Sequence, residues 1–144
     1  MAAFNKFNQF VQDVCSGVHQ FQTGTTHVLK VALTDTAPLA TNTVIANITQ
    51  VANGNGYTTD GATVGTITGA QTSGTMKVTG GTDPVFTASG AVGPFRYAVL
   101  FNSTPTSPLK PLIGWWDYGS SISLATGETF TVDIDQTNGL FTVT

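Results

Sequence analysis

Hydrophobic residues recur at intervals of three and four positions at the start of the chain. The residues on this spacing are Phe4, Phe7, Val11, Val14 and Val18, with polar residues between them. Such spacing predicts an amphipathic α-helix, and Gly17 is expected to mark its end. Phe10 widens the apolar face of this helix. The face is expected either to pack on the chain's own core or to dock, as an arm, on a neighbouring subunit.

From His27 onward the hydrophobic period changes to two. Leu29, Val31 and Leu33 fall on one face of this stretch and the intervening residues fall on the other, which predicts a β-strand. Further strands are expected at 63–68, 75–79, 85–88, 95–102, 112–117, 122–124, 129–135 and 140–144. Short strands separated by turns are typical of a mainly β, antiparallel β-sandwich or barrel-like fold.

Two segments between these strands carry local signals of their own. The hydrophobic spacing of residues 44–51 suits a short helix, for which Asn42 or Thr43 is the expected N-cap. Asn138-Gly139 is a pair that tolerates positive φ, so it predicts a tight hairpin between the last two strands.

The length of 144 residues is that of one ordinary domain, with 1–20 as an N-terminal helix or arm and 21–144 as the β domain. Charged residues make up only 9% of the chain, against roughly 25% in a typical soluble domain. Thr, Ser, Asn, Gln and Gly must therefore cover the surface, and such a surface repels its own copies weakly. With five Lys and Arg residues in all, nucleic acid is not an expected partner. A membrane is not expected either, because no apolar run approaches the ~18 residues of a membrane-spanning helix.

Residue types that perform catalysis or bind metals are scarce. His19 and His27 are eight positions apart and match no zinc-binding spacing, and Cys15 lies among apolar residues where it is expected to act as a small hydrophobic side chain. Asp133 and Asp135 could share one strand face, but paired carboxylates without further oxygen ligands bind cations weakly. We expect no catalytic residue, no metal site and no cofactor. An enzyme would need a pocket built from Asp117, Asp133, Asp135, Glu128 and a histidine.

The lone cysteine excludes an intrachain disulfide, and the first residues lack the continuous apolar stretch of a secretory signal. These features indicate folding in a cytosol. Combined with a coat-like surface, they suggest a viral structural protein that is made in the host cytoplasm.

The aromatic run Trp115-Trp116-Asp117-Tyr118 is the strongest candidate for a binding surface. Strand alternation sends Trp115 and Trp116 to opposite faces, so a core on one side cannot bury both rings. The second ring is expected to be presented to a partner, or else to be covered by a loop or by the N-terminal helix. Exposed Trp and Tyr side chains are favoured at protein interfaces and also stack on sugars.

Five segments of the chain resemble small structural proteins of tailed bacteriophages, and head decoration (cement) proteins in particular. They are Phe4–Val14, Leu29–Pro38, Gly54–Thr58, Gly93–Asn102 and Pro111–Gly119. The resemblance implies a virion protein that binds the outer surface of the phage head and stabilises contacts between major capsid subunits, in many copies or as a homo-oligomer. It brings no catalytic residues.

The expected partners are the major capsid protein and copies of this chain. The expected partner-binding residues are Phe4, Phe7, Phe10, Trp115, Trp116 and Tyr118. A tail or head-fibre component is one alternative. The other is a carbohydrate-binding module that uses Trp115, Trp116, Tyr118 and Tyr57.

Overall fold

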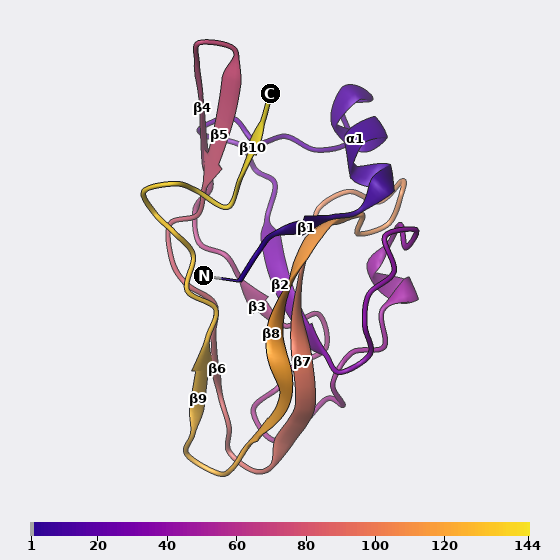
Figure 1. Cartoon of the computed structure of the whole chain (residues 1–144), viewed down its shortest axis with the longest axis vertical. Helices are drawn as coiled ribbons and strands as arrows, with labels where there is room; N and C mark the ends of the chain where they lie inside the picture. Colours follow the sequence, from indigo (N-terminus) through magenta and orange to yellow (C-terminus); the bar gives the residue numbers. More distant parts are fainter. Residues whose placement is uncertain (1) are drawn as a thin grey trace.

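The structure, a computed structural model, describes residues 2–144 and is mainly β with one short α-helix, as expected. Its centre is a five-stranded antiparallel sheet in the order β1-β8-β7-β2-β3. The long strands β7 (Val92–Asn102) and β8 (Leu112–Leu124) form the middle of this sheet (Figure 1). β2 (Leu29–Thr34) pairs with β7, while β3 (Ala62–Thr63) and β1 (Asn5–Lys6) form the two edges.

Two smaller antiparallel sheets lie against one face of the central sheet. One contains β10 (Phe141–Val143), β5 (Thr75–Thr79) and β4 (Thr68–Thr72), in that order, and the other pairs β6 (Val85–Thr87) with β9 (Thr129–Thr131). In Figure 1 the β4–β5 hairpin lies at the same end of the molecule as α1, with β10 between them, and the β6–β9 ribbon lies at the other end. The result is a sandwich-like domain.

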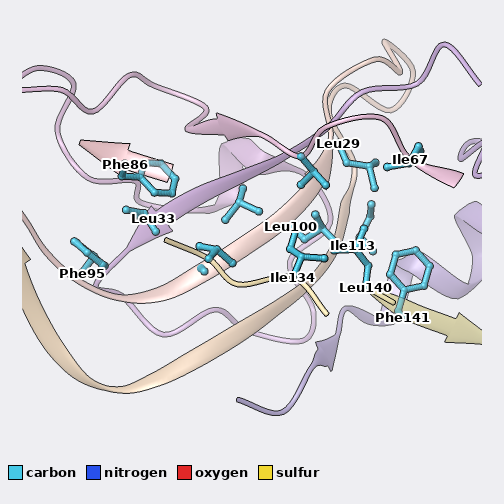
Figure 2. Close-up of a cluster of buried hydrophobic side chains, with 14 of the residues drawn as sticks. Leu29, Leu33, Ile67, Phe86, Phe95, Leu100, Ile113, Ile134, Leu140 and Phe141 are labelled. Atoms are coloured by element: carbon cyan, nitrogen blue, oxygen red, sulfur yellow. The ribbon is translucent and has the colours of Figure 1, made fainter. Parts of the chain in front are cut away.

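The main hydrophobic core fills the space between these layers. In Figure 2, Leu100, Ile113 and Ile134 occupy its middle, while Phe95 and Phe141 lie toward opposite ends. Leu29, Val31 and Leu33 all enter this core from β2, which confirms the face predicted from their alternation.

The opposite face of the central sheet is also covered. A second apolar cluster contains Phe7, Ala32, Ile45, Ile48, Val99, Phe101 and Leu112. Its cover is the loop around a single 3₁₀ turn, η1 (Ile45–Asn47), together with Phe7. Residues 44–51 therefore form one tight turn rather than a longer helix. The N-cap residue of this turn is Val44, so the expected cap at Asn42 or Thr43 is wrong. The Asn47 side chain accepts hydrogen bonds from the backbone N–H groups of Thr43 and Val44.

The N-terminal helix is shorter than predicted. Helix α1 spans Asn8–Cys15, because the residues before it form β1 and pair with the edge of β8. It turns Phe10 and Asp13 into the protein, whereas Val11, predicted on the apolar face, is 49% exposed. Phe10 and Val14 of the predicted face still pack on the main core, so the buried face differs from the prediction mainly at Val11 and Asp13.

Several strand predictions change, and the strand predicted at 129–135 is confirmed only at Thr129–Thr131. Residues 63–68 do not form one strand, because Val64 and Ile67 both enter the core, and a spacing of three requires the chain to leave the two-residue period between them. Residues 112–117 and 122–124 belong to the single strand β8, which accommodates Gly119 at φ +100° in an irregular stretch of its pairing with β7.

The hairpin expected at Asn138-Gly139 is absent from the structure of residues 2–144. β9 pairs with β6 and β10 pairs with β5, so the strands on either side of this turn belong to different sheets. Among the same residues, no helix is both long and apolar enough to cross a membrane.

Candidate functional site

The residues that flank the N-terminal strand β1 pack against both tryptophans of the aromatic run on β8. β1 lies beside β8 with Asn5 opposite Trp115, so the side chains that flank β1 reach different faces of the sheet. The Phe4 ring lies 5.3 Å from the Trp116 ring, and the Phe7 ring lies 4.6 Å from the Trp115 ring. Trp116 packs against the main core and Trp115 against the second cluster, as predicted from strand alternation. The chain's own N-terminal segment therefore covers the second ring.

This packing separates the six expected partner-binding residues. Phe7 is 0% exposed and Phe10 is 4% exposed, so neither offers surface to a partner in this structure. We correct the expectation for these two, because their rings complete the two hydrophobic clusters instead. Phe4, Trp115 and Trp116 are half-buried. Tyr118 is 57% exposed and is the most accessible of the six.

Tyr118 borders a pocket of about 180 Å³ between the β7–β8 pair and the β9 segment. The pocket is lined mainly by apolar and aromatic side chains. Its lining residues are Ala2, Phe95, Arg96, Tyr97, Ala98, Trp116, Tyr118, Phe130, Thr131, Val132 and Asp133. We call this feature the aromatic pocket.

Three rings fix the shape of the aromatic pocket. Phe130 packs edge to face on Phe95 at 4.9 Å between ring centroids and on Tyr118 at 5.7 Å. Phe95 is buried in the main core and therefore anchors the other two rings. Such perpendicular contacts are favoured by the ring quadrupoles, so the walls of the aromatic pocket are formed before any ligand arrives.

An ion pair lies at the rim of the aromatic pocket. The Arg96 guanidinium donates two hydrogen bonds to the Asp117 carboxylate, at 2.7 and 2.8 Å, and also lies 5.3 Å from the centre of the Tyr97 ring. The hydrogen bonds from Arg96 and from the Gly119 N–H hold the pKa of Asp117 below its usual value. Asp133 differs, because its exposed carboxylate has no hydrogen-bond partner within residues 2–144.

The other carboxylates that an enzyme would need have structural partners elsewhere. Glu128 accepts a hydrogen bond from the Ala125 N–H, and Asp135 accepts bonds from the backbone of Thr137 and Asn138. The backbone and side-chain bonds from Asn138 lower the pKa of Asp135. Within residues 2–144 no three His, Cys, Asp or Glu side chains are grouped so that they could hold a metal ion.

The structure also forms a buried polar cluster that the sequence did not indicate. The Asn102 side-chain amide lies 3.2 Å from Nδ1 of His19 and 2.8 Å from Nδ1 of His27. His19 also stacks on Phe21, at 5.3 Å between rings. Burial lowers the pKa of His19 to about 4, although the nearby Asp13 carboxylate acts to raise it. No spacing rule could have found this cluster, because its members lie far apart in the sequence.

Cys15 is exposed at the last residue of α1, so the expectation that it packs as a buried hydrophobic side chain is wrong. The helix directs Phe10 and Asp13 inward, and a residue five positions after Phe10 on a helix of this length points away from that face.

No protein family, curated protein or solved structure matches this chain.

Proposed function

We propose that the protein is a structural component of a phage particle, a decoration protein that binds the outer surface of the head and stabilises contacts between major capsid subunits. The resemblance of five sequence segments to such proteins supports the virion as its location. On this proposal the protein has no catalytic role and acts through the surface area that it covers.

The single observation that carries the proposal is the exposed surface of low charge. The β4–β5 hairpin illustrates it, because residues 68–76 are all uncharged and are mostly exposed. Lys77 is the first charged residue in the hairpin. A surface of hydroxyl, amide and glycine backbone groups allows many copies to pack closely with little electrostatic repulsion. Each copy would need to bury on the order of 1,000 Å² to hold its place.

The aromatic pocket supplies an anchor on this surface. Exposed Tyr118 and half-buried Trp116 combine large apolar area with few rotatable bonds, which is the usual composition of an energetic centre in an interface. The Phe4 ring packs on Trp116 at 5.3 Å and would border the contact, whereas Trp115 lies on the opposite face of the sheet.

Binding to phage heads that lack the protein tests this proposal. Purified chain is added to such heads, and a reconstruction then gives its position and copy number. We expect hundreds of copies over the outer shell and a greater resistance of the shell to heat or chelation. Six or twelve copies at one vertex would assign the protein to the tail or to a head fibre instead, and no bound copies would refute a structural role on the head.

A carbohydrate-binding module is the second candidate, and the exposed Tyr118 ring beside the aromatic pocket favours it. A glycan array with the isolated chain tests this candidate. Binding of a defined sugar that is lost in Tyr118→Ala would support it, whereas the decoration role requires no sugar binding.

A further inference from the structure

We propose that the aromatic pocket binds the side chain of a lysine or arginine presented by the partner protein. This inference deepens the proposed function by naming the chemistry of the partner, and it rests on that function only for the partner's identity. It comes from three properties of the pocket: its aromatic walls, its size and its unpaired carboxylate.

The aromatic walls suit a long side chain with a cationic end. Trp116, Tyr118 and Phe130 all line the pocket, and Phe130 and Tyr118 stand nearly perpendicular, at 79°. The face of an aromatic ring is the negative part of its quadrupole and attracts an ammonium or guanidinium group within about 6 Å. The methylene stem of the same side chain can pack against these rings while its charged end stays near the rim.

The size of the pocket limits the ligand to a single side chain or a ligand of similar size. The volume of the aromatic pocket is about 180 Å³. A peptide backbone or a chain of sugars would have to remain outside. The partner therefore inserts one residue, and the surface around the pocket makes the remaining contacts.

The charges of the lining favour a cation. Arg96, Asp133, Tyr97 and Tyr118 are the titratable side chains that line the pocket. The Arg96 charge is balanced by Asp117 through two hydrogen bonds. Among residues 2–144, Asp133 has no hydrogen-bond or ion-pair partner, so no residue that the structure describes balances its negative charge. An anionic side chain would be repelled by Asp133, and a neutral one would gain nothing from it.

NMR titration of the whole chain with small probes tests the proposal. The probes are N-acetyl-lysine methylamide, its uncharged counterpart N-acetyl-norleucine methylamide, and methyl glucoside, each followed through the indole N–H signal of Trp116. We expect a saturable shift with the lysine probe at millimolar concentrations and binding about tenfold weaker with the norleucine probe, since a cation–π contact and an exposed ion pair add modest energies. Equal binding of the lysine and norleucine probes would overturn the proposal, and so would a saturable shift with the glucoside alone.

Two variants locate the binding energy. Asp133→Asn should weaken the lysine probe severalfold while leaving the norleucine probe unchanged, and Tyr118→Ala should weaken both. Glu128→Gln is the matched control. It removes the same charge from an exposed residue outside the pocket lining, and the glutamine oxygen can still accept the bond from the Ala125 N–H. An Asp133→Asn variant with unchanged affinity for the lysine probe would refute the role of the carboxylate. Asp133, Tyr118 and Glu128 are all exposed, so none of these substitutions is expected to unfold the protein.

The outcome is separable from that of the proposed function, because the titration needs no phage particle. If Asp133→Asn loses affinity for the lysine probe but the unchanged protein does not bind heads, the lysine-binding role of the pocket stands and the decoration role is rejected. Head binding without any lysine preference in the pocket would do the reverse.

Discussion

Buried polar side chains in this protein satisfy backbone groups that no strand reaches. The Tyr57 hydroxyl accepts a hydrogen bond from the Leu33 N–H at 3.1 Å and donates one to the Gln50 side chain. β3 is only two residues long and pairs with Lys30 and Val31, so it does not extend to Leu33. The Tyr57 hydroxyl takes the place of a strand partner for the Leu33 N–H. Burial raises the pKa of the Tyr57 hydroxyl to about 12, so the hydroxyl stays protonated and can donate to Gln50 even in mildly alkaline solution.

Removing that hydroxyl should be costly. Tyr57→Phe keeps the ring and its stacking on Phe86 but leaves the buried Leu33 N–H without a partner. We expect a loss of about 1–3 kcal/mol in the free energy of unfolding, measured by urea denaturation. Tyr118→Phe, at an exposed ring, is the control and should change the stability by less than about 0.5 kcal/mol. Equal effects of the two variants would contradict this role for Tyr57.

The second residue-scale prediction concerns acid. His19 has a pKa of about 4 in the folded protein and of 6.5 in the unfolded chain. Between pH 6.5 and pH 4 the unfolded state therefore binds a proton at His19 that the folded state does not bind. Stability is therefore complete above pH 6.5 and falls as the pH drops toward 4, by up to about 3 kcal/mol. Burial also lowers the pKa of His27, which adds a smaller effect of the same sign.

Unfolding curves collected from pH 7 to pH 4.5 measure this dependence. His19→Phe, which can still stack on Phe10 and Phe21, should flatten it. His27→Asn should flatten it less, because His27 is only half-buried. A slope that persists unchanged in His19→Phe would show that other groups cause it.

At the scale of elements, the N-terminal segment is part of the sandwich. β1 supplies backbone partners to the edge of β8, and Phe4 and Phe7 pack on the two faces of the sheet beside it. Gly114 on β8 allows this close approach, since a Cβ there would lie 2.6 Å from the Asn5 carbonyl oxygen. An arm that left the domain to dock elsewhere would expose the Trp115 ring and an unpaired strand edge.

Two substitutions in this segment should therefore differ strongly. Phe7→Ala empties a fully buried site against Trp115 and should cost about 3–5 kcal/mol, whereas Val11→Ala, on the exposed face of α1, should cost less than about 0.5 kcal/mol. Thermal or urea unfolding measures both. A small cost for Phe7→Ala would mean that the segment does not pack on the domain in solution and would restore the docking-arm hypothesis.

At the scale of the whole molecule, apolar burial on both faces of one sheet stabilises a chain that contains few charges. Within residues 2–144 the ion pairs are Arg96–Asp117 and Lys110–Asp60, and both are partly exposed. Exposed pairs of this kind contribute little and are screened by salt. The net charge of −3 also leaves little overall repulsion to screen.

Stability should therefore be nearly independent of ionic strength. Raising NaCl from about 0.05 to about 1 M is expected to change the free energy of unfolding by less than about 1 kcal/mol, measured in urea at constant pH. Lys110→Met should respond to salt no more than the unchanged protein does. A loss of several kcal/mol in high salt would show that electrostatic interactions carry more of the stability than these two pairs explain.

The sequence by itself determined features that follow from backbone periodicity within one element. The inward face of β2 and the opposite directions of Trp115 and Trp116 follow from the pleat, in which successive side chains alternate. The bounds of β5 are those predicted at 75–79. Tyr118 and Trp116 of the aromatic pocket could likewise be named in advance from their residue types.

Only the tertiary structure decided how those faces are covered. Competition between helix and strand for residues 4–7 was settled by β8, far along the chain. The Asn102 cluster joins residues separated by 75 and 83 positions, and the aromatic pocket takes its rings from three different strands. Such contacts depend on which strands become neighbours, and no local spacing rule encodes that choice.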